Sequence, residues 1–269
     1  MKKFLYFPLF FILLLPSLSF ASKYAAIVMD YRTGKILHAV NADAPRYPAS
    51  LTKMMTLFMT FDALKSGRLT LKTSLPVSQH AASRAPSKLG LRAGERVSVK
   101  TLILAMVTRS ANDAATVIGE ALGQGSERRF ARMMTIRAKQ LGLQKTNFSN
   151  ASGLPEATQF TTARDMAKLA RALLIVHPEY YHYFQVKKFV YKGEVCLTHN
   201  HMLGRYAGID GLKTGYCRAS GFNIATSMKK GNQRLIGVVM GLDSPQSRDR
   251  HMAYLLHKIF RRYPSFSQT

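Results

Sequence analysis

Hydrophobic and polar positions form two different patterns along the chain. At both ends, short apolar segments bounded by turn residues are typical of β-strands. Five segments fit this pattern: residues 23–30, 35–40, 210–217, 221–230 and 233–242. Gly34 lies between the first two and favours a hairpin turn, and Gly231-Asn232 between the last two is a strong hairpin signal. Each end of the chain therefore predicts paired antiparallel strands.

The central part of the chain and its last segment have apolar residues at helical spacing. Helices are expected over residues 99–109, 113–123, 127–142, 161–176 and 247–263, with mostly loops and short strands over 68–100. A further helix is expected to begin at Ser50 and end at Gly67. Its apolar residues spread around nearly the whole circumference, which indicates a central, buried helix. Thr162 is expected to cap a helix, with Asp165 completing a variant capping box.

Strands therefore begin and end the chain, and helices fill its middle. This order predicts an α/β fold in which an antiparallel sheet, built from both chain ends, is flanked by helices and accompanied by a mostly helical lobe. The composition is 47% hydrophobic, which is enough for a substantial core. We expect one large domain or two closely packed lobes.

The first 21 residues are expected to be a secretory signal peptide. Lys2 and Lys3 precede an apolar run, Pro16 breaks it, and Ser19-Phe20-Ala21 places small residues before a cleavage site after Ala21. The run is short for a membrane span of about 20 residues. We therefore expect domain 22–269 to be exported, with membrane contact only through the transient leader. Cys196 and Cys217 are too few for a disulfide framework, and whether they form a single bridge stays open.

The charge is strongly positive. The chain has 39 Lys and Arg against 14 Asp and Glu, a net charge of +25, which falls to +23 without Lys2 and Lys3. Such a surface attracts polyanions. For an exported protein, anionic cell-envelope polymers or lipid headgroups fit better than nucleic acid, although a basic surface without a dedicated partner is the simpler alternative.

Ser50 and Lys53 form the first candidate for chemistry. Their spacing places both side chains on one helical face, within reach of each other. A serine hydroxyl needs a base to become a nucleophile, and a lysine in an apolar setting loses part of its preference for the charged form. Alone, however, this short pattern is compatible with Ser50 as a helix cap and Lys53 extending to solvent.

Two further short motifs could contribute to the same site. Ser110 and Asn112 lie between two apolar helices, where a turn would have to aim both side chains in one direction. Lys213, Thr214 and Gly215 lie in an expected strand and could offer a charge, a hydroxyl and room for close backbone approach. Each motif also has an ordinary structural interpretation, as a cap or a strand end.

Together and in this order, the three motifs resemble the active-site set of the penicillin-binding proteins and serine β-lactamases. The stretches PASLTKMMT, SANDAA, QFTTARDM and GLKTGY further resemble the low-molecular-mass D-alanyl-D-alanine carboxypeptidases, and the resemblance covers roughly residues 24–262. It implies the β-lactamase/DD-peptidase fold and an exported enzyme of the periplasm or cell envelope. It also implies a serine peptidase that trims peptidoglycan stem peptides through an acyl-enzyme, is inhibited by β-lactams, and uses no metal or other cofactor.

The resemblance also implies roles for individual residues. Ser50 would attack the carbonyl between the two terminal D-alanines, and Lys53 would accept its proton. Ser110 and Asn112 would relay protons and orient the substrate, and the backbone N–H groups of Ser50 and Tyr216 would form the oxyanion hole. The substrate-binding positions are Lys213, Thr214, Gly215, Tyr216 and Arg248. Among these, Lys213, Thr214 and Arg248 would hold the terminal carboxylate; for Arg248 the alternative is a surface charge.

Several alternatives stay open at this stage. The C-terminal β-rich domain and terminal amphipathic helix of the best-known carboxypeptidases are not expected here, and a compact chain also resembles the family's endopeptidases, which cut cross-links. Glu156 and Asp165 are the nearest candidates for the glutamate that activates water in class A β-lactamases, and neither is convincing. A basic cell-wall-binding protein without activity is a third alternative. His199 and His201 could face one side of a strand, but no further ligand accompanies them securely, so we expect no metal.

Overall fold

The structure is a computed structural model that describes residues 23–263. The predicted signal peptide, residues 1–21, lies outside the described residues. Within them, no helix is long and apolar enough to span a membrane. Both cysteines, Cys196 and Cys217, are free thiols.

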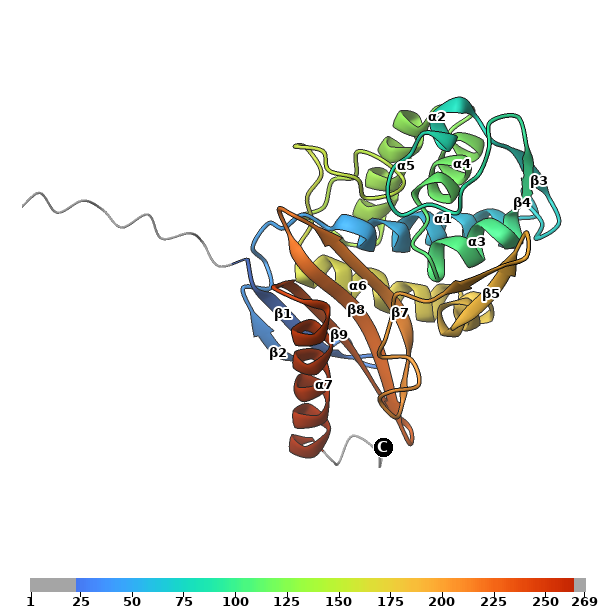
Figure 1. The fold of residues 1–269 in the computed structure, drawn as a ribbon. Coiled ribbons are helices and arrows are strands. Elements are labelled where there is room, and N and C mark those ends of the chain that lie inside the picture. Colours follow the sequence, from blue (N-terminus) through green and yellow to red (C-terminus); the bar gives the residue numbers. More distant parts are fainter. Residues whose placement is uncertain (1–22, 264–269) are drawn as a thin grey trace, which may run out of the picture.

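A five-stranded antiparallel sheet joins the two ends of the chain, as predicted (Figure 1). The strand order is β2-β1-β9-β8-β7, and all five predicted strands are present. Their bounds are Ala25–Asp30 (β1), Ile36–Val40 (β2), Ile209–Cys217 (β7), Gly221–Lys230 (β8) and Gln233–Leu242 (β9). The N-terminal hairpin meets the C-terminal strands where β1 pairs with β9, with Ile27 opposite Val238. This order leaves β7 at one edge of the sheet.

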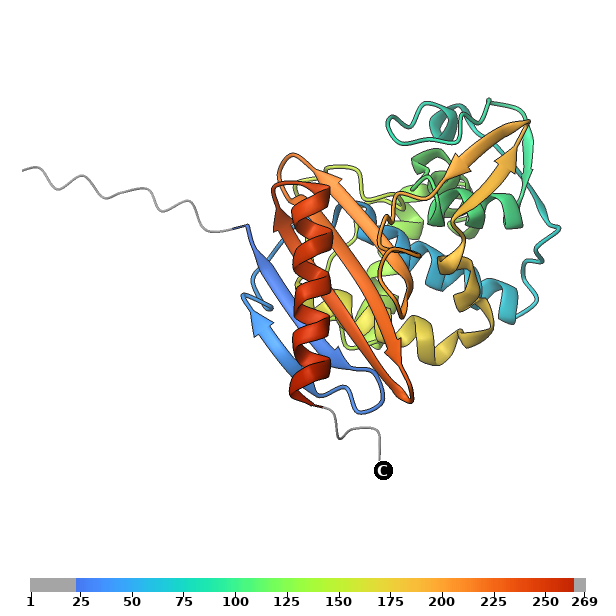
Figure 2. The same cartoon turned by 60° about the horizontal axis from the view of Figure 1, so that its bottom comes forward.

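Helices cover both faces of the sheet. The last helix, α7 (Pro245–Arg262), packs on the outer face, where Val28 and Val239 meet Met252 (Figure 2). On the other face, Ile27 and Val238 join the main core, which includes α6 (Ala163–Val176) and α1 (Lys53–Lys65). Alternate residues of β1 therefore point into two different apolar layers, which explains why that strand is an uninterrupted apolar run.

A mostly helical lobe lies beside the sheet (Figure 1). It contains α3 (Val99–Val107), α4 (Asn112–Leu122) and α5 (Glu127–Gln140), together with a short helix α2 (Gln79–Ala82) and the two-stranded sheet of β3 (Ser74–Pro76) and β4 (Arg96–Ser98). The apolar residues of α1 are buried around the whole helix, so the prediction of a central helix is confirmed.

The structure corrects the predicted start of the helix at Ser50. Residues Ala49–Thr52 form a 3-10 turn (η1), and α1 begins only at Lys53. Ala49 has a positive φ of 47°, and the N–H of Leu51 donates to Pro48 O, three residues back. The carbonyl of Ala49 lies so close to Gly153 that a Cβ on this glycine would be 1.9 Å away. The tighter first turn, Ala49–Thr52, therefore packs directly against the loop of residues 150–153.

One further local prediction is wrong, and two segments were missed. Thr162 does cap α6 by accepting from the N–H of Asp165, but the Asp165 carboxylate bonds to Lys145 N and Thr146 Oγ1, so the capping box is only half formed. The sequence reading also missed a 3-10 segment, Pro178–Gln185 (η2), and the hairpin of β5 (Lys188–Tyr191) and β6 (Glu194–Leu197). The turn Lys192-Gly193, with positive φ at both residues, was the available signal for that hairpin.

Candidate active site

Ser50 and Lys53 lie together at the junction of η1 and α1. The Lys53 Nζ donates to Ser50 Oγ at 3.1 Å, to Asn112 Oδ1 at 2.7 Å and to the carbonyl of Ser152 at 2.6 Å. Lys53 is completely buried, so the alternative in which its amine extends to solvent is wrong. Three acceptors match the three donors of an ammonium group, and all three are neutral.

The burial of Lys53 changes its acidity. Desolvation lowers the pKa of its amine well below the ordinary lysine value, and the nearby charge of Lys213 lowers it further. The carboxylates of Asp113 and Glu127 oppose this shift, but neither forms a direct hydrogen bond with the amine among the described residues. A neutral amine 3.1 Å from a serine hydroxyl can accept the proton of that hydroxyl.

The turn between α3 and α4 aims Ser110 and Asn112 toward the same site. Ser110 has a φ of +57°, and its buried Oγ has no hydrogen-bond partner among the described residues. The Asn112 side chain accepts from Lys53 and donates through Nδ2 to the carbonyls of Ala85 and Pro86, both at 2.8 Å. Asn112 is therefore fixed from both ends of its amide, whereas the Ser110 hydroxyl has no hydrogen-bond partner among the described residues that would compete with another ligand.

Edge strand β7 forms the other wall of the site. Lys213 is almost fully buried, and its amine donates to Thr214 O at 2.9 Å. Burial, followed by the charge of Arg248, lowers the pKa of Lys213 to about 7. A Cβ on Gly215 would lie only 3.1 Å from Ser50 N, so the glycine does allow the close backbone approach proposed from the sequence.

Arg248 lies at the start of α7 and is only 4% exposed. The alternative of a surface charge on a basic helix is therefore wrong. Its Nε donates to Asp249 Oδ1 at 2.8 Å, and this carboxylate is also buried. Because Asp249 neutralises much of the charge, Arg248 can be held in a buried position beside Lys213.

These segments surround one cavity of about 360 Å³. Six of the nine predicted site residues line it: Ser50, Ser110, Thr214, Gly215, Tyr216 and Arg248. The other three, Lys53, Asn112 and Lys213, are buried beside these lining residues and are linked to them through the chain, hydrogen bonds or charge. Pro86, Ser87, His199, His201, Phe222 and Pro245 complete the lining.

His199 and His201 belong to this cavity, although the sequence suggested only a discounted metal site for them. They lie in a loop and not on a strand. Burial and the neighbouring cations lower the pKa of His199 to about 4, so this imidazole is neutral at pH 7. The described residues contain no group of three or more His, Cys, Asp or Glu side chains that could hold a metal ion.

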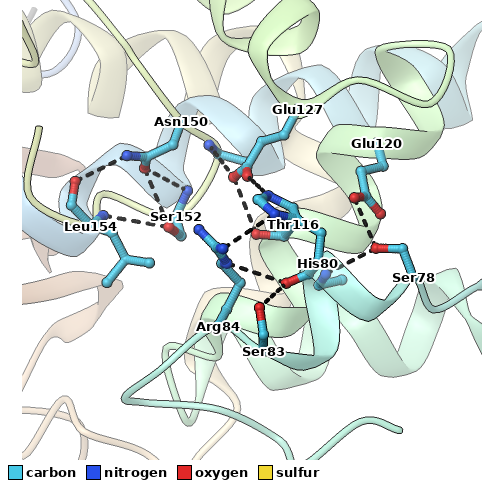
Figure 3. A network of polar contacts seen from close by, with 12 residues as sticks. Ser78, His80, Ser83, Arg84, Thr116, Glu120, Glu127, Asn150, Ser152 and Leu154 are labelled. Atoms are coloured by element: carbon cyan, nitrogen blue, oxygen red, sulfur yellow. Dashed lines mark hydrogen bonds and ion pairs between the residues drawn. The ribbon is translucent and has the colours of Figure 1, made fainter. Parts of the chain in front are cut away.

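The sequence reading missed the loop that supplies an acceptor to Lys53. The Asn150 Oδ1 accepts from the backbone N–H and the Oγ of Ser152 (Figure 3). It also accepts from the backbone N–H of Gly153, and together these bonds shape the turn that presents the Ser152 carbonyl. Glu127 holds the same loop by accepting from the N–H of Ala151 at 3.0 Å. The motif Asn-x-Ser-Gly, which is typical of a side-chain-stabilised turn, was the available signal.

A second supporting loop was also missed. The buried Asp113 carboxylate accepts from the backbone N–H groups of Leu89, Gly90 and Leu91. It therefore anchors the segment that carries Pro86 and Ser87 into the cavity wall. Residues 110–113 thus orient both the Lys53 amine and an adjacent wall of the site.

Known proteins are similar to this chain in sequence and in fold. Residues 17–244 match the peptidase S11 family, described as D-alanyl-D-alanine carboxypeptidase. The chain is 34% identical to D-alanyl-D-alanine carboxypeptidase DacF of Bacillus subtilis over 250 residues, which is 89% of this chain and 62% of that protein. It is 36% identical to DacD of Escherichia coli over 237 residues, covering 86% of this chain and 61% of that protein. The chain thus spans about three-fifths of the length of these relatives.

Solved structures agree in fold. Penicillin-binding protein 5 of Haemophilus influenzae superposes with a TM-score of 0.84 at 33% identity, over 87% of this chain and 69% of that one. Penicillin-binding protein D2 of Listeria monocytogenes, solved in a cefotaxime-bound form, gives a TM-score of 0.80 at 31% identity, over 89% of this chain and 98% of that one. The predicted fold class is confirmed.

Proposed function

The chain belongs to the D-alanyl-D-alanine carboxypeptidase family of peptidases, and on that premise we propose that it is a serine peptidase that trims peptidoglycan stem peptides. The observation that carries the proposal is the contact between the buried Lys53 amine and Ser50 Oγ at 3.1 Å, at the edge of a cavity. A hydroxyl and a depressed-pKa amine in hydrogen-bond contact are the requirements for an activated serine nucleophile.

In the first step, Ser50 Oγ attacks the carbonyl carbon between the two terminal D-alanines, and Lys53 accepts the hydroxyl proton. The C–N bond then breaks, and the leaving amine takes a proton back. Ser110 is suited to that transfer because its buried hydroxyl lies on the same cavity and has no competing partner among the described residues. Asn112 keeps the Lys53 amine oriented.

Backbone groups stabilise the negative charge that develops on the carbonyl oxygen. We assign the oxyanion hole to the N–H groups of Ser50 and Tyr216, since the close approach of Gly215 to Ser50 N places the two backbones side by side. A side chain at position 215 would push them apart. Lys213, Thr214 and Arg248 would bind the substrate's terminal carboxylate at the other side of the cavity.

Water then releases the shortened peptide from Ser50. The two acids considered as class A-type water activators do not fit this step. Glu156 is exposed and does not line the cavity, and the Asp165 carboxylate is engaged by Lys145 N and Thr146 Oγ1. β-Lactams should therefore acylate Ser50 and be released slowly, as expected for a peptidase and not for a β-lactamase.

The proposed partners and location follow from this activity. The substrates are peptidoglycan stem peptides, the inhibitors are β-lactams, and the working site is the cell envelope, with anionic envelope polymers as candidate ligands of the basic surface. An inactive basic cell-wall-binding protein is disfavoured because the buried Lys53 is oriented toward Ser50, an arrangement that mere binding does not need.

Labelling with a fluorescent penicillin tests the proposal. We expect one label per chain, lost in Ser50→Ala and retained in Ser66→Ala, which removes an exposed hydroxyl at the far end of α1. Incubation with pentapeptide muropeptides should release free D-alanine. Label that persists in Ser50→Ala, or a native protein that takes no label and releases nothing, would contradict the proposed function.

A further inference from the structure

The loop of residues 198–201 brings two histidines to the cavity that the proposed reaction does not use. His199 and His201 both line the cavity that holds Ser50. His199 is an exposed residue, so its ring is accessible to a ligand in the cavity. The ring forms no hydrogen bond within residues 23–263. It is therefore free to contact a substrate.

The backbone around His199 is anchored on both sides. The N–H of His199 donates to the carbonyl of Thr108 at 3.1 Å, which ties the loop to the end of α3, beside the turn that carries Ser110. On the other side, Asn200 Oδ1 accepts from the N–H of Met202 at 3.2 Å, and both of these residues are buried. A ring carried by such a fixed loop can act as a wall, because it cannot move away without breaking these contacts.

The neighbouring charges place His199 between the two halves of the site. The cations that lower its pKa include Lys213 of β7, Arg109 of the α3–α4 turn and Lys53 of α1. Lys213 belongs to the proposed carboxylate site. Arg109 directly precedes Ser110, the proposed proton donor to the leaving amine. The His199 ring therefore lies between the group that binds the carboxylate and the group that protonates the amine.

A leaving D-alanine would span the same interval. In the proposed function its carboxylate binds at Lys213, Thr214 and Arg248, and its amine lies beside Ser110. The Cα and the side chain of this residue must then lie between these groups, next to His199. The imidazole is neutral at pH 7, so it does not compete with the two cations for the carboxylate, and it is left to contact the side chain.

We propose that His199 determines the specificity for the leaving group, because its imidazole forms the wall against which the side chain of the C-terminal D-residue packs. This inference rests on the proposed function and names its substrate class, which is peptides that end in a D-amino acid with a methyl-sized side chain and a free carboxylate. The cavity of about 360 Å³ is near the lower end of the range for ligand pockets, as expected for a small leaving residue. A larger side chain would have to displace the anchored ring, which costs transition-state binding.

Removing the ring tests the wall in the whole protein. Release of the terminal D-amino acid is measured as kcat/KM for two acylated tripeptides, one ending in D-Ala-D-Ala and the other in D-Ala-D-Leu. The native protein should prefer the first. In His199→Ala, we expect this preference to fall about tenfold or more, mainly through faster release of D-leucine. A gain of activity on one substrate cannot come from a damaged fold.

A second variant at the same position grades the effect. His199→Asn keeps a polar side chain but shortens it, so its preference should lie between those of the native protein and His199→Ala. It also tests the wall if His199→Ala does not fold. One fluorescent penicillin label per chain shows that the Ser50 site of each variant is intact.

The matched control is His182→Ala, which removes an exposed imidazole of η2 that does not line the cavity. Its preference should equal that of the native protein. The inference is overturned if the folded His199 variants slow both tripeptides equally, if His201→Ala or His182→Ala relaxes the preference as much as His199→Ala, or if the native protein releases D-leucine as fast as D-alanine. A native protein that releases no D-alanine and takes no penicillin label would instead remove the proposed function on which the inference rests.

Discussion

Two buried lysines set the electrostatics of the site at the scale of single residues. Lys53 is surrounded by neutral acceptors, namely Ser50 Oγ, Asn112 Oδ1 and the Ser152 carbonyl. A carboxylate in the same place would favour the ammonium and raise the pKa of Lys53. Hydrogen bonding without a direct ion pair therefore keeps the amine positioned while desolvation favours its neutral form.

The two lysines should give opposite limbs to the pH profile. Lys53 acts as a base only when neutral, so kcat/KM for β-lactam acylation should rise with pH through its lowered pKa. Lys213 binds a carboxylate only when charged, and its pKa of about 7 means that its charge is lost above pH 7. We expect a bell-shaped profile of kcat/KM, which reports the free enzyme, with the alkaline limb near pH 7.

Lys213→Arg separates the two limbs, because a guanidinium stays protonated at every pH of the assay. The alkaline limb should move to higher pH, while the acidic limb should stay at the same pH. A KM at pH 7 close to the native value would show that the site accommodates the larger side chain, and a raised KM would show that it does not. An alkaline limb that does not move in an acylating Lys213→Arg variant would show that another group causes it.

At the scale of elements, the site is built where segments end. Ser50 and Lys53 lie where η1 joins α1, Ser110 lies in the α3–α4 turn, and Lys213 lies on an edge strand. Ends and edges leave backbone and side-chain groups unpaired by regular structure, so they are available to a substrate. The 150–153 loop then closes the back of the site by bonding to Lys53.

Asn150→Ala tests the role of that loop. It removes the acceptor of the Ser152 N–H group (Figure 3) and of the Gly153 N–H group. We expect a loss of about 1–3 kcal/mol in the free energy of unfolding, because buried donors lose their partner. Acylation should slow about tenfold or more, because Lys53 loses its fixed acceptor. Chemical denaturation and penicillin acylation kinetics measure the two effects.

Asn147→Ala is the matched control, since it deletes the same side-chain amide nearby, where Nδ2 donates to Thr158 O and to no other group of residues 23–263. Its acylation rate should remain close to that of the native protein. If Asn150→Ala is destabilised and yet acylates at the native rate, the loop contributes to the fold and not to the position of Lys53.

At the scale of the whole molecule, the fold is held together by apolar packing and not by pairing of its charges. The 37 Lys and Arg of the described residues face 14 Asp and Glu, so most cations have no acid to pair with. The apolar layers on both faces of the sheet hold the fold together despite this repulsion. The excess charge is therefore available for anionic ligands, at a cost in self-repulsion.

Screening should accordingly stabilise this protein. Raising NaCl from about 0.02 M to about 0.3 M weakens repulsion between exposed cations, and we expect a higher Tm by a few degrees, on the order of 1 kcal/mol. Thermal unfolding followed by far-UV circular dichroism measures it, with a neutral osmolyte of equal osmolarity as the control. A Tm that falls with salt would mean that attractive surface pairs outweigh the repulsion.

Much of this protein follows from the sequence alone. The five strands, the hairpin at Gly231-Asn232 and the central buried helix were predicted because they depend on local turn residues and on the spacing of apolar side chains. The three motifs also pointed to the candidate chemistry, but only through the resemblance that they carry together, because the spacing of Ser50 and Lys53 alone was equally compatible with a helix cap and a solvent-exposed lysine.

Only the tertiary structure decided what surrounds those motifs. The bond from Lys53 to the Ser152 carbonyl spans 99 positions of the chain, and the pairing of β1 with β9 spans more than 200. Two other features also depend on packing between distant segments. His199 and His201 line the cavity, and a second hollow beside α7 adjoins it. Sequence patterns report which face of an element is apolar, whereas the neighbours of a polar side chain depend on how distant elements pack.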